Sequence, residues 1–454
     1  MQKSVVWDQA LLNKYNVNAP RYTSYPTALE FHSDFTEDAF REQVMGADSQ
    51  YLSLYIHIPF CHQLCYYCGC NKVITRHQTK ADEYLDYLEK EISLRGEMLG
   101  HKEVMQLHLG GGTPTFLNSQ QLARLISALK EKFQFSERAE ISIEIDPRRF
   151  EVARIGELHR LGFNRISLGV QDINPEVQKA INRIQESQHI ANLVLEARKT
   201  GIQSVNLDLV YGLPHQTPDA WEETLEFVLA LQPDRLSLFS YAHLPSRFAA
   251  QRKIKDAWLP SATQKVELFH MALDRFSEDG YVYIGLDHFA KPQDELSQAL
   301  AQRRLHRNFQ GYTVLEECDL LGLGVSSISQ LGRSFSQNHK KLTDYYQALE
   351  LQGPLERGVL LSDDDLIRQA IIKQIMCNGY LDFNHIGCKF GIDFDSYFIE
   401  ELKELSKLAD DKIIRLDKNK LEVTARGRLL VRNIASVFDA YLKNKSQASF
   451  SRAL

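Results

Sequence analysis

Short apolar runs recur along residues 50–290, and segments with the apolar spacing of amphipathic helices lie between them. Several runs are almost continuously apolar, which is typical of strands that are covered on at least one face. The predicted strands span residues 52–58, 105–109, 141–145, 165–170, 205–210 and 236–241. This regular alternation of strand and helix predicts parallel strands joined by right-handed crossovers.

The segments between the strands carry their apolar residues on one helical face. Leu122, Leu125 and Leu129 follow the three- and four-residue spacing of such a face. Another helix is predicted to begin at Pro218, because Thr217 is a favoured N-cap residue and proline is favoured at the first helical position. These signals place a helix after most of the predicted strands.

Polar or glycine-rich residues follow nearly every predicted strand, at residues 59–61, 110–113, 146–147, 171–172, 212–214 and 242–243. An open doubly wound sheet would concentrate such residues at one switch point. A barrel brings the loops after all its strands to one face. We therefore predict an α/β fold containing a partial (β/α)6, TIM-like barrel, with the functional site at the carboxyl ends of its strands.

The two ends of the chain differ from this pattern. Residues 1–36 form an irregular arm rich in Tyr, Pro and Thr, either a loop packed on the core or a lid. From residue 361 a helix opened by Ser362, a second helix over 396–408, a hairpin over 413–424 and a final helix are predicted. The predicted domains are the arm (1–36), a catalytic barrel (37–350) and a small, mainly helical C-terminal domain (361–454).

The composition narrows the function classes. With 454 residues, 44% hydrophobic and 25% charged, the chain is neither disordered nor fibrous. Helix, hairpin and helix could form a winged helix. However, residues 361–454 carry 15 Lys or Arg against 14 Asp or Glu, and the whole chain has a net charge of −6. We therefore predict no nucleic-acid partner.

A membrane location is also not predicted. Residues 49–71 carry no Asp, Glu, Lys or Arg, but His57, Pro59 and four cysteines interrupt the run. The N-terminus reaches Asp8 before an apolar run can form, so no signal peptide is expected. The expected location is the cytoplasm.

Four of the seven cysteines, Cys61, Cys65, Cys68 and Cys70, fall within ten residues. Zinc sites use four ligands, usually in two separated pairs, and ferredoxin clusters use other spacings. Three close thiolates can instead hold three corners of a [4Fe-4S] cluster and leave one iron open for a small molecule. The alternative is an accidental run of buried cysteines, which would oxidise readily.

The Cys61-x3-Cys65-x2-Cys68 motif, with Tyr67 before its last cysteine, resembles the radical S-adenosylmethionine (SAM) superfamily. The segments 68–72, 110–115 and 306–312 (His-Arg-Asn-Phe-Gln-Gly-Tyr), together with the arm at 20–26, resemble the family of oxygen-independent coproporphyrinogen III oxidases. The resemblance covers essentially the whole chain.

This resemblance implies a radical SAM type of barrel and oxidative decarboxylation of two propionates of coproporphyrinogen III to vinyl groups. The product is protoporphyrinogen IX, and a 5′-deoxyadenosyl radical made from SAM at the cluster starts the reaction. An unidentified reductant, such as a flavodoxin-type donor, and an unidentified electron acceptor are implied, and a monomer is expected. The alternatives are a related heme chaperone, which binds heme without decarboxylation, and a plain iron–sulfur electron carrier.

The resemblance also implies ligand-binding residues. Cys61, Cys65 and Cys68 would bind the cluster. Two SAM molecules are implied, the first contacted by Tyr55, Tyr67, Gly111, Glu144, Ala242 and Ile328, and the second by Gly112, Thr113, Gln171, Arg183 and Asp208.

For most of these residues a structural role is the alternative. The glycines could simply form a sharp turn, Glu144 and Asp208 could form core salt bridges, and Tyr55, Ala242 and Ile328 could be core residues. Arg21, His306 and Arg307 are candidate partners of the substrate propionates or solvated surface charges. No catalytic residue is assigned.

Overall fold

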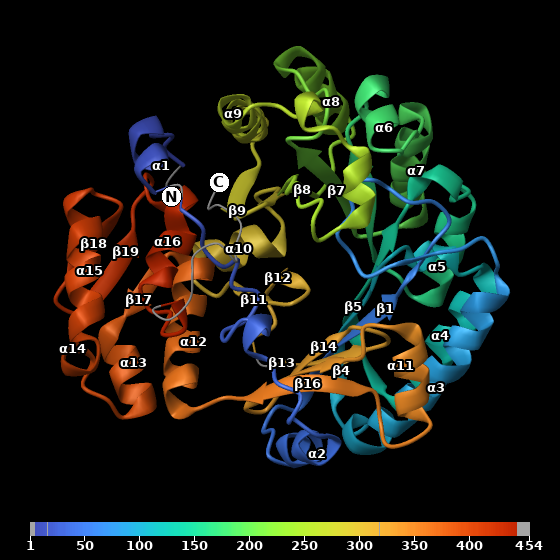
Figure 1. The fold of residues 1–454 in the computed structure, drawn as a ribbon, viewed down its shortest axis with the longest axis horizontal. Coiled ribbons are helices and arrows are strands. Elements are labelled where there is room, and N and C mark those ends of the chain that lie inside the picture. Colours follow the sequence, from blue (N-terminus) through green and yellow to red (C-terminus); the bar gives the residue numbers. More distant parts are fainter. Residues whose placement is uncertain (1–4, 16, 317, 443–454) are drawn as a thin grey trace. The chain divides into compact units, whose positions relative to one another are not determined.

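The computed structural model describes residues 5–15, 17–316 and 318–442, and the chain divides into two compact units (Figure 1). Unit 2 comprises Phe31–Asp279 and Glu317–Leu360. Unit 1 comprises Met1–Glu30, Gly280–Glu316 and Leu361–Leu454. Each unit is therefore built from segments that are distant in the sequence.

Unit 2 contains six parallel strands in the order β1-β4-β5-β6-β7-β8. Their bounds are β1 Tyr51–Ile58, β4 Glu103–Gly111, β5 Gln134–Ile145, β6 Arg165–Gln171, β7 Ser204–Tyr211 and β8 Arg235–Ser240. β1 lies between β13 (Cys318–Leu323) and β4 rather than beside β8, so the six strands do not close on themselves. This arrangement confirms the predicted parallel β/α architecture of a partial barrel.

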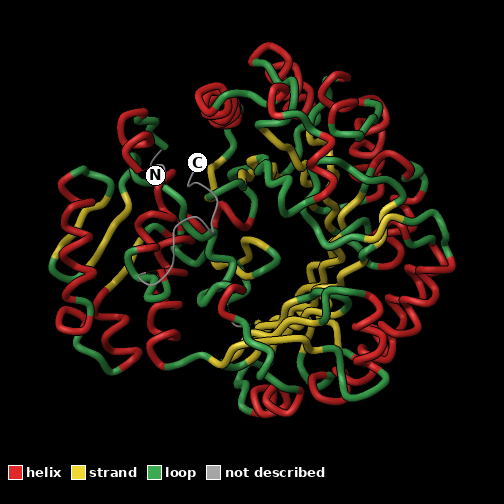
Figure 2. Tube along the Cα trace, viewed as in Figure 1, coloured by secondary structure: helices red, strands yellow, loops and turns green. Residues whose placement is uncertain are grey.

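Helices follow the six strands and cover the sheet (Figure 2). They are α3 Thr79–Leu99, α4 Ser119–Lys132, α5 Arg154–Leu161, α6 Pro175–Ala180, α7 Ser187–Thr200, α8 Pro218–Ala230 and α9 Ala262–Glu278. Local capping explains where two of them begin. Thr217 accepts a hydrogen bond from the Ala220 N–H at the start of α8, and Asn118 forms a capping box with Gln121 at the start of α4.

Other elements complete unit 2. Strands β13, β14 (Ile328–Leu331), β15 (Ser334–Asn338) and β16 (Leu355–Leu360) extend the sheet beyond β1, with antiparallel pairing from β13 to β16. A two-stranded ladder pairs β2 (Phe60–Cys61) with β3 (Val73–Ile74). The remaining helices are α2 Glu37–Met45, η2 Pro114–Phe116, η3 Pro147–Arg149, η4 Ala249–Lys253, η5 Asp256–Trp258 and α11 Leu342–Leu349.

Unit 1 is mainly helical. Its helices are α1 Gln9–Tyr15, η1 Ala28–Glu30, α10 Glu295–Ala301, α12 Asp363–Asn378, α13 Phe383–Phe390, α14 Phe394–Tyr397, α15 Ile399–Asp410, η6 Arg428–Leu430 and α16 Val431–Ser436. Its strands form two hairpins and one three-stranded sheet of order β17-β19-β18. They are β9 Val282–Gly285, β10 His288–Ala290, β11 His306–Asn308, β12 Gly311–Thr313, β17 Tyr380–Asp382, β18 Ile414–Asp417 and β19 Lys420–Val423.

The predicted C-terminal elements are present, with differences in detail. Ser362 caps α12 through a capping box with Asp365, as its sequence indicates. The pattern missed β17 and α13, since a three-residue strand and a two-turn helix carry too few residues to show a period. The final helix, α16, ends at Ser436 and is therefore shorter than predicted.

The arm is part of the core of unit 1 rather than a loose strap. Tyr22 and Tyr25 are 7% and 2% exposed, and the Tyr22 hydroxyl donates to Asp439 at 3.0 Å. The Arg432 Nε atom donates to the Pro20 carbonyl at 3.0 Å. A short helix, α1, also precedes this segment, although the irregular composition did not predict one. The prediction of a loop packed on the core is therefore closer to the structure than that of a lid.

The compact units cut the chain differently from the sequence-based domains. Residues 280–316 group with the C-terminal region in unit 1, whereas the sequence pattern placed them in the barrel. Residues 31–36 group with unit 2 instead of the arm, and His32 pairs with Gly358 of β16. Among the described residues, no helix is long and apolar enough to cross a membrane.

Candidate active site

A cavity of about 500 Å³ opens in unit 2 at the carboxyl ends of the parallel strands. Gly111, Gln171 and Ser240 end β4, β6 and β8, and all three line it. We call it the strand-end cavity. The predicted site residues that line it are Cys61, Cys65, Tyr67, Cys68, Gly111, Gly112, Thr113, Glu144, Gln171, Arg183, Asp208 and Ala242. The structure thus brings together residues from five strands and the cysteine loop.

The cysteine loop is closed by the short ladder between β2 and β3, which pairs Cys61 with Ile74. Hydrogen-bond donors point at two of its sulfur atoms. Thr113 Oγ1 donates to Cys61 Sγ at 3.4 Å, and Arg148 Nη2 donates to Cys65 Sγ at 3.3 Å. Arg183 Nη1 lies 3.6 Å from Cys65 Sγ. Such donors stabilise thiolates, so this set of residues suits an iron–sulfur cluster.

The thiols of the loop differ in acidity. Burial raises the pKa of Cys61 to about 11. A hydrogen bond with Cys70, together with the charge of Lys72, lowers the pKa of Cys68 to about 6 despite burial. The Cys68 thiol therefore ionises more readily than the Cys61 thiol.

Within residues 5–15, 17–316 and 318–442, no three His, Cys, Asp or Glu side chains converge closely enough to hold a single metal ion. A four-iron cluster has a different requirement, because each thiolate binds a different iron atom. Three cysteines that line one cavity suit that requirement.

The Gly110-Gly111-Gly112 turn leaves no room for side chains. Gly111 has a φ of 118°, which favours glycine, and a Cβ there would lie 2.7 Å from the His57 ring. At Gly112 a Cβ would lie 2.5 Å from the Pro59 carbonyl oxygen. The sharp turn therefore requires glycine at both positions. The same two glycines line the strand-end cavity with backbone atoms alone.

Glu144 is not the buried acid that its apolar neighbours predicted. Its side chain is 43% exposed and lines the cavity, while its neighbours Ile143 and Ile145 are buried. Glu144 Oε2 accepts a hydrogen bond from the Gly111 N–H at 3.3 Å, and Oε1 lies 3.5 Å from His108 Nε2. The carboxylate thus faces the cavity next to the glycine turn.

Asp208 is held by neutral partners. Ser167 Oγ donates to one of its oxygens at 2.7 Å, and Asn206 Nδ2 donates to the other at 2.8 Å. Burial raises the pKa of Asp208 to about 6. Asp208 therefore does not form a salt bridge with these partners, although a core salt bridge was the alternative interpretation of this residue. Its side chain lines the strand-end cavity.

Gln171 and Arg183 lie beside the end of β6. Gln171 adopts a φ of 66°, an unusual backbone conformation for a residue with a side chain. Arg183 Nη2 donates to the Gly169 carbonyl at 2.8 Å and lies 3.5 Å from Asp146. Burial opposes ionisation of Asp146, but the charges of Arg183 and Arg148 bring its pKa below the usual range. A buried ion pair therefore supports this edge of the cavity.

Two predicted residues, Tyr55 and Ile328, do not line the cavity. The Tyr55 hydroxyl lies 3.2 Å from His57 Nδ1, and its ring stacks on His108 at 5.9 Å. Ile328 begins β14, where it pairs with Gln337. Their contact with SAM stays a prediction.

No sequence pattern indicates one buried residue of the site, Gln251. It is 2% exposed in η4, and its Nε2 atom donates to the carbonyls of Tyr67 and Ala242, both at 3.1 Å. This single side chain fixes two predicted ligand-binding residues that are 175 positions apart. Nothing local distinguishes Gln251 from a surface glutamine, so only the folded chain reveals it.

A smaller cavity of about 170 Å³, the side cavity, adjoins the strand-end cavity in unit 2. Four residues line both cavities: Gln63, Thr113, Asp146 and Arg148. The side cavity also contains His62, whose ring lies on Phe116 at 4.4 Å. The cysteine loop is therefore approached by a second cavity.

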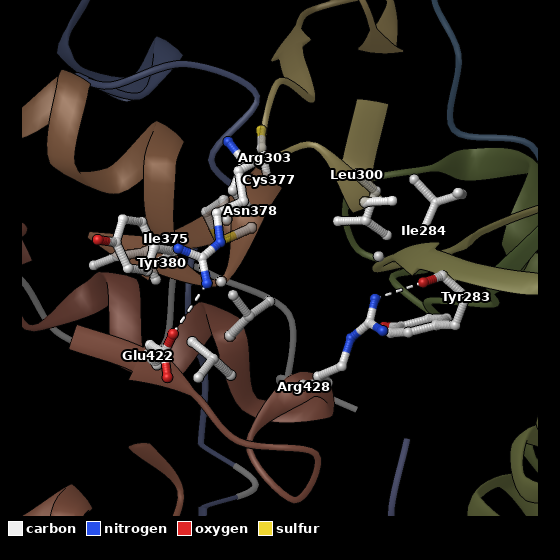
Figure 3. A pocket seen from close by; sticks show the side chains of 16 residues that line it. Tyr283, Ile284, Leu300, Arg303, Ile375, Cys377, Asn378, Tyr380, Glu422 and Arg428 are labelled. Atoms are coloured by element: carbon white, nitrogen blue, oxygen red, sulfur yellow. Dashed lines mark hydrogen bonds and ion pairs between the residues drawn. The ribbon is translucent and has the colours of Figure 1, made fainter. Parts of the chain in front are cut away.

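Unit 1 contains a separate cavity of about 250 Å³ (Figure 3). Arg303 lies 3.8 Å from the centre of the Tyr380 ring and pairs with Glu422 at 3.0 Å. On another wall Arg428 donates to the Tyr283 carbonyl at 2.6 Å. No residue that the sequence predicted as a ligand lines this cavity.

The candidate propionate-binding residues also lie in unit 1. Arg307 is 8% exposed and donates to the Arg21 carbonyl at 2.5 Å, so it is not a solvated surface charge. Arg21 forms an ion pair with Asp287, and His306 lies 3.3 Å from Glu316. Their contact with substrate stays a prediction.

Known proteins resemble this chain along its whole length. The family model of the radical SAM superfamily matches residues 55–228, and that of the HemN C-terminal domain matches residues 361–430. The chain is 52% identical over 455 residues to the oxygen-independent coproporphyrinogen III oxidase of Salmonella typhimurium, covering 100% of both chains. It is 46% identical over 462 residues to that of Pseudomonas aeruginosa, again covering 100% of both.

A solved structure is also similar along nearly the whole chain. It is that of coproporphyrinogen III oxidase (HemN) from Escherichia coli, described as a radical SAM enzyme, with a TM-score of 0.93 and 50% identity. The match covers 97% of this chain and 100% of that one. Membership of the radical SAM superfamily implies a [4Fe-4S] cluster and SAM. The chain belongs to the oxygen-independent coproporphyrinogen III oxidase family of radical SAM enzymes.

Proposed function

We propose that this chain converts coproporphyrinogen III to protoporphyrinogen IX in heme biosynthesis without oxygen. Two propionate side chains would each lose carbon dioxide, a hydrogen and an electron to become vinyl groups. The observation that carries the proposal is the strand-end cavity, in which three cysteines lie together with Glu144 and Asp208. Full-length identity to coproporphyrinogen III oxidases supports the substrate.

Cys61, Cys65 and Cys68 would hold the cluster, and Cys70 would not. Bound together, the cluster and SAM would supply a 5′-deoxyadenosyl radical that abstracts hydrogen from the substrate. The protein's own contribution is positional and electrostatic. Thr113 and Arg148 donate hydrogen bonds to cysteine sulfur atoms, and such bonds help to set the reduction potential of a cluster.

Two SAM molecules are proposed to bind in the strand-end cavity. The first would contact Tyr55, Tyr67, Gly111, Glu144, Ala242 and Ile328, and the second would contact Gly112, Thr113, Gln171, Arg183 and Asp208. The bare glycine turn supports close approach of a ligand to the backbone, and Glu144 and Asp208 offer acceptors for hydroxyl or ammonium groups. The Arg183 Nε atom is buried without a hydrogen-bond partner and could serve as a donor.

The reaction also requires partners. We propose a flavodoxin-type protein as reductant and a separate electron acceptor, with the chain acting as a monomer in the cytoplasm. Full-length similarity to coproporphyrinogen III oxidases favours the enzyme over the chaperone alternative.

The decisive experiment is an anaerobic incubation of the reconstituted protein with coproporphyrinogen III, SAM and dithionite, followed by chromatography of the porphyrins. We expect protoporphyrinogen IX, with one SAM consumed per decarboxylation. Stable binding of heme without any decarboxylation would favour the chaperone. Absence of SAM cleavage by protein that holds a complete cluster would contradict the radical mechanism.

A further inference from the structure

The side cavity approaches the cysteine sulfur atoms from outside the proposed SAM-binding space. Thr113 and Arg148 line both cavities, and each donates a hydrogen bond to a cysteine sulfur, Thr113 to Cys61 and Arg148 to Cys65. A molecule seated at the side cavity is therefore separated from those sulfur atoms by one side chain. Electron tunnelling weakens steeply with distance, so this short separation makes the side cavity a good place for electrons to enter.

The charge around the side cavity has the opposite sign to that of the whole chain. Arg148, Arg149 and Arg154 line it, and Asp146 is its one acidic lining residue among those described. The protein as a whole carries a net charge of −6. A local basic surface attracts an acidic partner and guides its approach.

Two arginines supply the positive charge that a partner can reach. Arg148 is paired with Asp146 at 2.6 Å, and Arg154 lies 3.8 Å from Glu157. Arg149 and Arg76 are exposed instead. Arg149 lines the side cavity, and Arg76 lies two residues before Gln78, which also lines it.

We propose that the side cavity, with Arg76 and Arg149 beside it, is the docking surface for an acidic flavoprotein reductant. This inference rests on the proposed function, which needs one electron for each SAM that is cleaved. The anionic flavin hydroquinone gives up one electron to the oxidised cluster and becomes the neutral semiquinone, and no proton has to move. Arg76 and Arg149 orient the donor, while Thr113 and Arg148 form the thin wall through which the electron passes.

The test measures binding of oxidised flavodoxin to the cluster-loaded protein at ionic strengths of about 0.02 M and about 0.3 M. The test variant is Arg76→Glu with Arg149→Glu. The matched control is Arg138→Glu with Arg160→Glu, which changes the net charge equally. Arg138 lies near the amino end of β5, and Arg160 lies at the end of α5 that leads into β6, so both are exposed at the opposite ends of these elements from the cysteine loop.

At low ionic strength we expect the test variant to lose affinity for flavodoxin by at least about tenfold, and the control variant by at most about twofold. High salt should weaken binding of the wild-type protein toward that of the test variant. Iron content and decarboxylation driven by dithionite should be the same in all three proteins.

Three results would overturn the docking surface: no flavodoxin binding by the wild-type protein, unchanged affinity in the test variant, or an equal loss in the control. Failure of the proposed function has a different signature. In that case the wild-type protein would not decarboxylate coproporphyrinogen III with dithionite, whatever its affinity for flavodoxin. The two failures are therefore distinguishable in the same set of samples.

Discussion

The strand-end cavity of unit 2 and the cavity of unit 1 are built in different ways. The first is lined by residues that follow successive parallel strands, from Cys61 to Gln251, so one structural rule places most of its wall. The second is lined by β9, the end of α10, the end of α12, β17, β19 and the start of α16, with no repeated rule (Figure 3). A repeated β/α unit makes a site visible in the sequence, and an assembly of unlike elements does not.

The chemistry of the two cavities differs as well. The strand-end cavity gathers thiols and carboxylates, and its donors point at sulfur atoms. In the unit 1 cavity Arg303 already has Glu422 and a tyrosine ring as partners. We therefore expect substitutions in the first cavity to act on cofactor binding, and substitutions in unit 1 to act on stability.

The largest expected effect is the loss of the cluster. Serine in place of Cys61, Cys65 or Cys68 should abolish the four-iron absorption spectrum after anaerobic reconstitution, because a serine hydroxyl group is a poor iron ligand compared with a thiolate. Cys388→Ser, an exposed cysteine of unit 1, should leave the spectrum unchanged. Cys70→Ser should also keep the cluster, and failure of that variant to assemble one would falsify the assignment of three ligands.

A large effect on stability is expected in unit 1. Tyr25→Ala should lower the free energy of unfolding by about 3–5 kcal/mol, because it empties a buried aromatic site. Tyr25→Phe removes only the hydroxyl that accepts the Ala440 N–H, and should cost about 1 kcal/mol. Chemical denaturation measures both values. If Tyr25→Ala instead unfolded at the wild-type denaturant concentration but lost turnover, the arm would serve the substrate rather than the core.

Gly112→Ala should disturb the turn locally. The new Cβ would meet the Pro59 carbonyl oxygen, so the backbone must shift, at a cost of about 1–3 kcal/mol. We expect weaker SAM binding, measured by equilibrium dialysis, with iron content retained. Gly156→Ala in α5 is a useful control, because Gly156, like Gly112, has no positive φ, and its new Cβ would meet no atom closer than 3.6 Å. Equal loss of SAM binding in both variants would show that the effect is global.

The pKa of Asp208 predicts a pH dependence of SAM binding. With a pKa of about 6, roughly a tenth of the carboxyl groups are ionised at pH 5, so affinity at the proposed second SAM site should fall about tenfold from pH 7 to pH 5. For folding the sign is reversed: neutral Asp208 stabilises the fold at acid pH, and this contribution is lost as the pH rises through about 6. Asp208→Asn should bind weakly at every pH, and a wild-type-like pH profile in that variant would exclude this carboxylate.

The smallest effect is expected from the unit 1 cavity. Arg303 is 51% exposed and its partner Glu422 is 21% exposed, so Arg303→Ala should change the free energy of unfolding by at most about 1 kcal/mol. Iron content and SAM cleavage should match those of the wild-type protein. A large loss of either would show that the two cavities are not functionally separate, and the contrast between them would have to be abandoned.

The sequence by itself determined the elements and motifs that depend on near neighbours. The six parallel strands, the caps at Thr217 and Ser362, the glycine turn and the cysteine loop are all visible, because periodicity, capping and ligand spacing act over a few residues. Most of the strand-end cavity followed from these local signals, since parallel strands carry their carboxyl ends to one edge.

Only the tertiary structure decided the rest. Tyr22 and Tyr25 are buried through contacts with residues more than 400 positions away. The exposure of the Glu144 side chain depends on which face of β5 the rest of the fold covers. Gln251 fixes Tyr67 and Ala242 through hydrogen bonds that no local pattern encodes. These features are set by which distant segments pack together, and packing energy is shared among many weak contacts that leave no periodic trace in the chain.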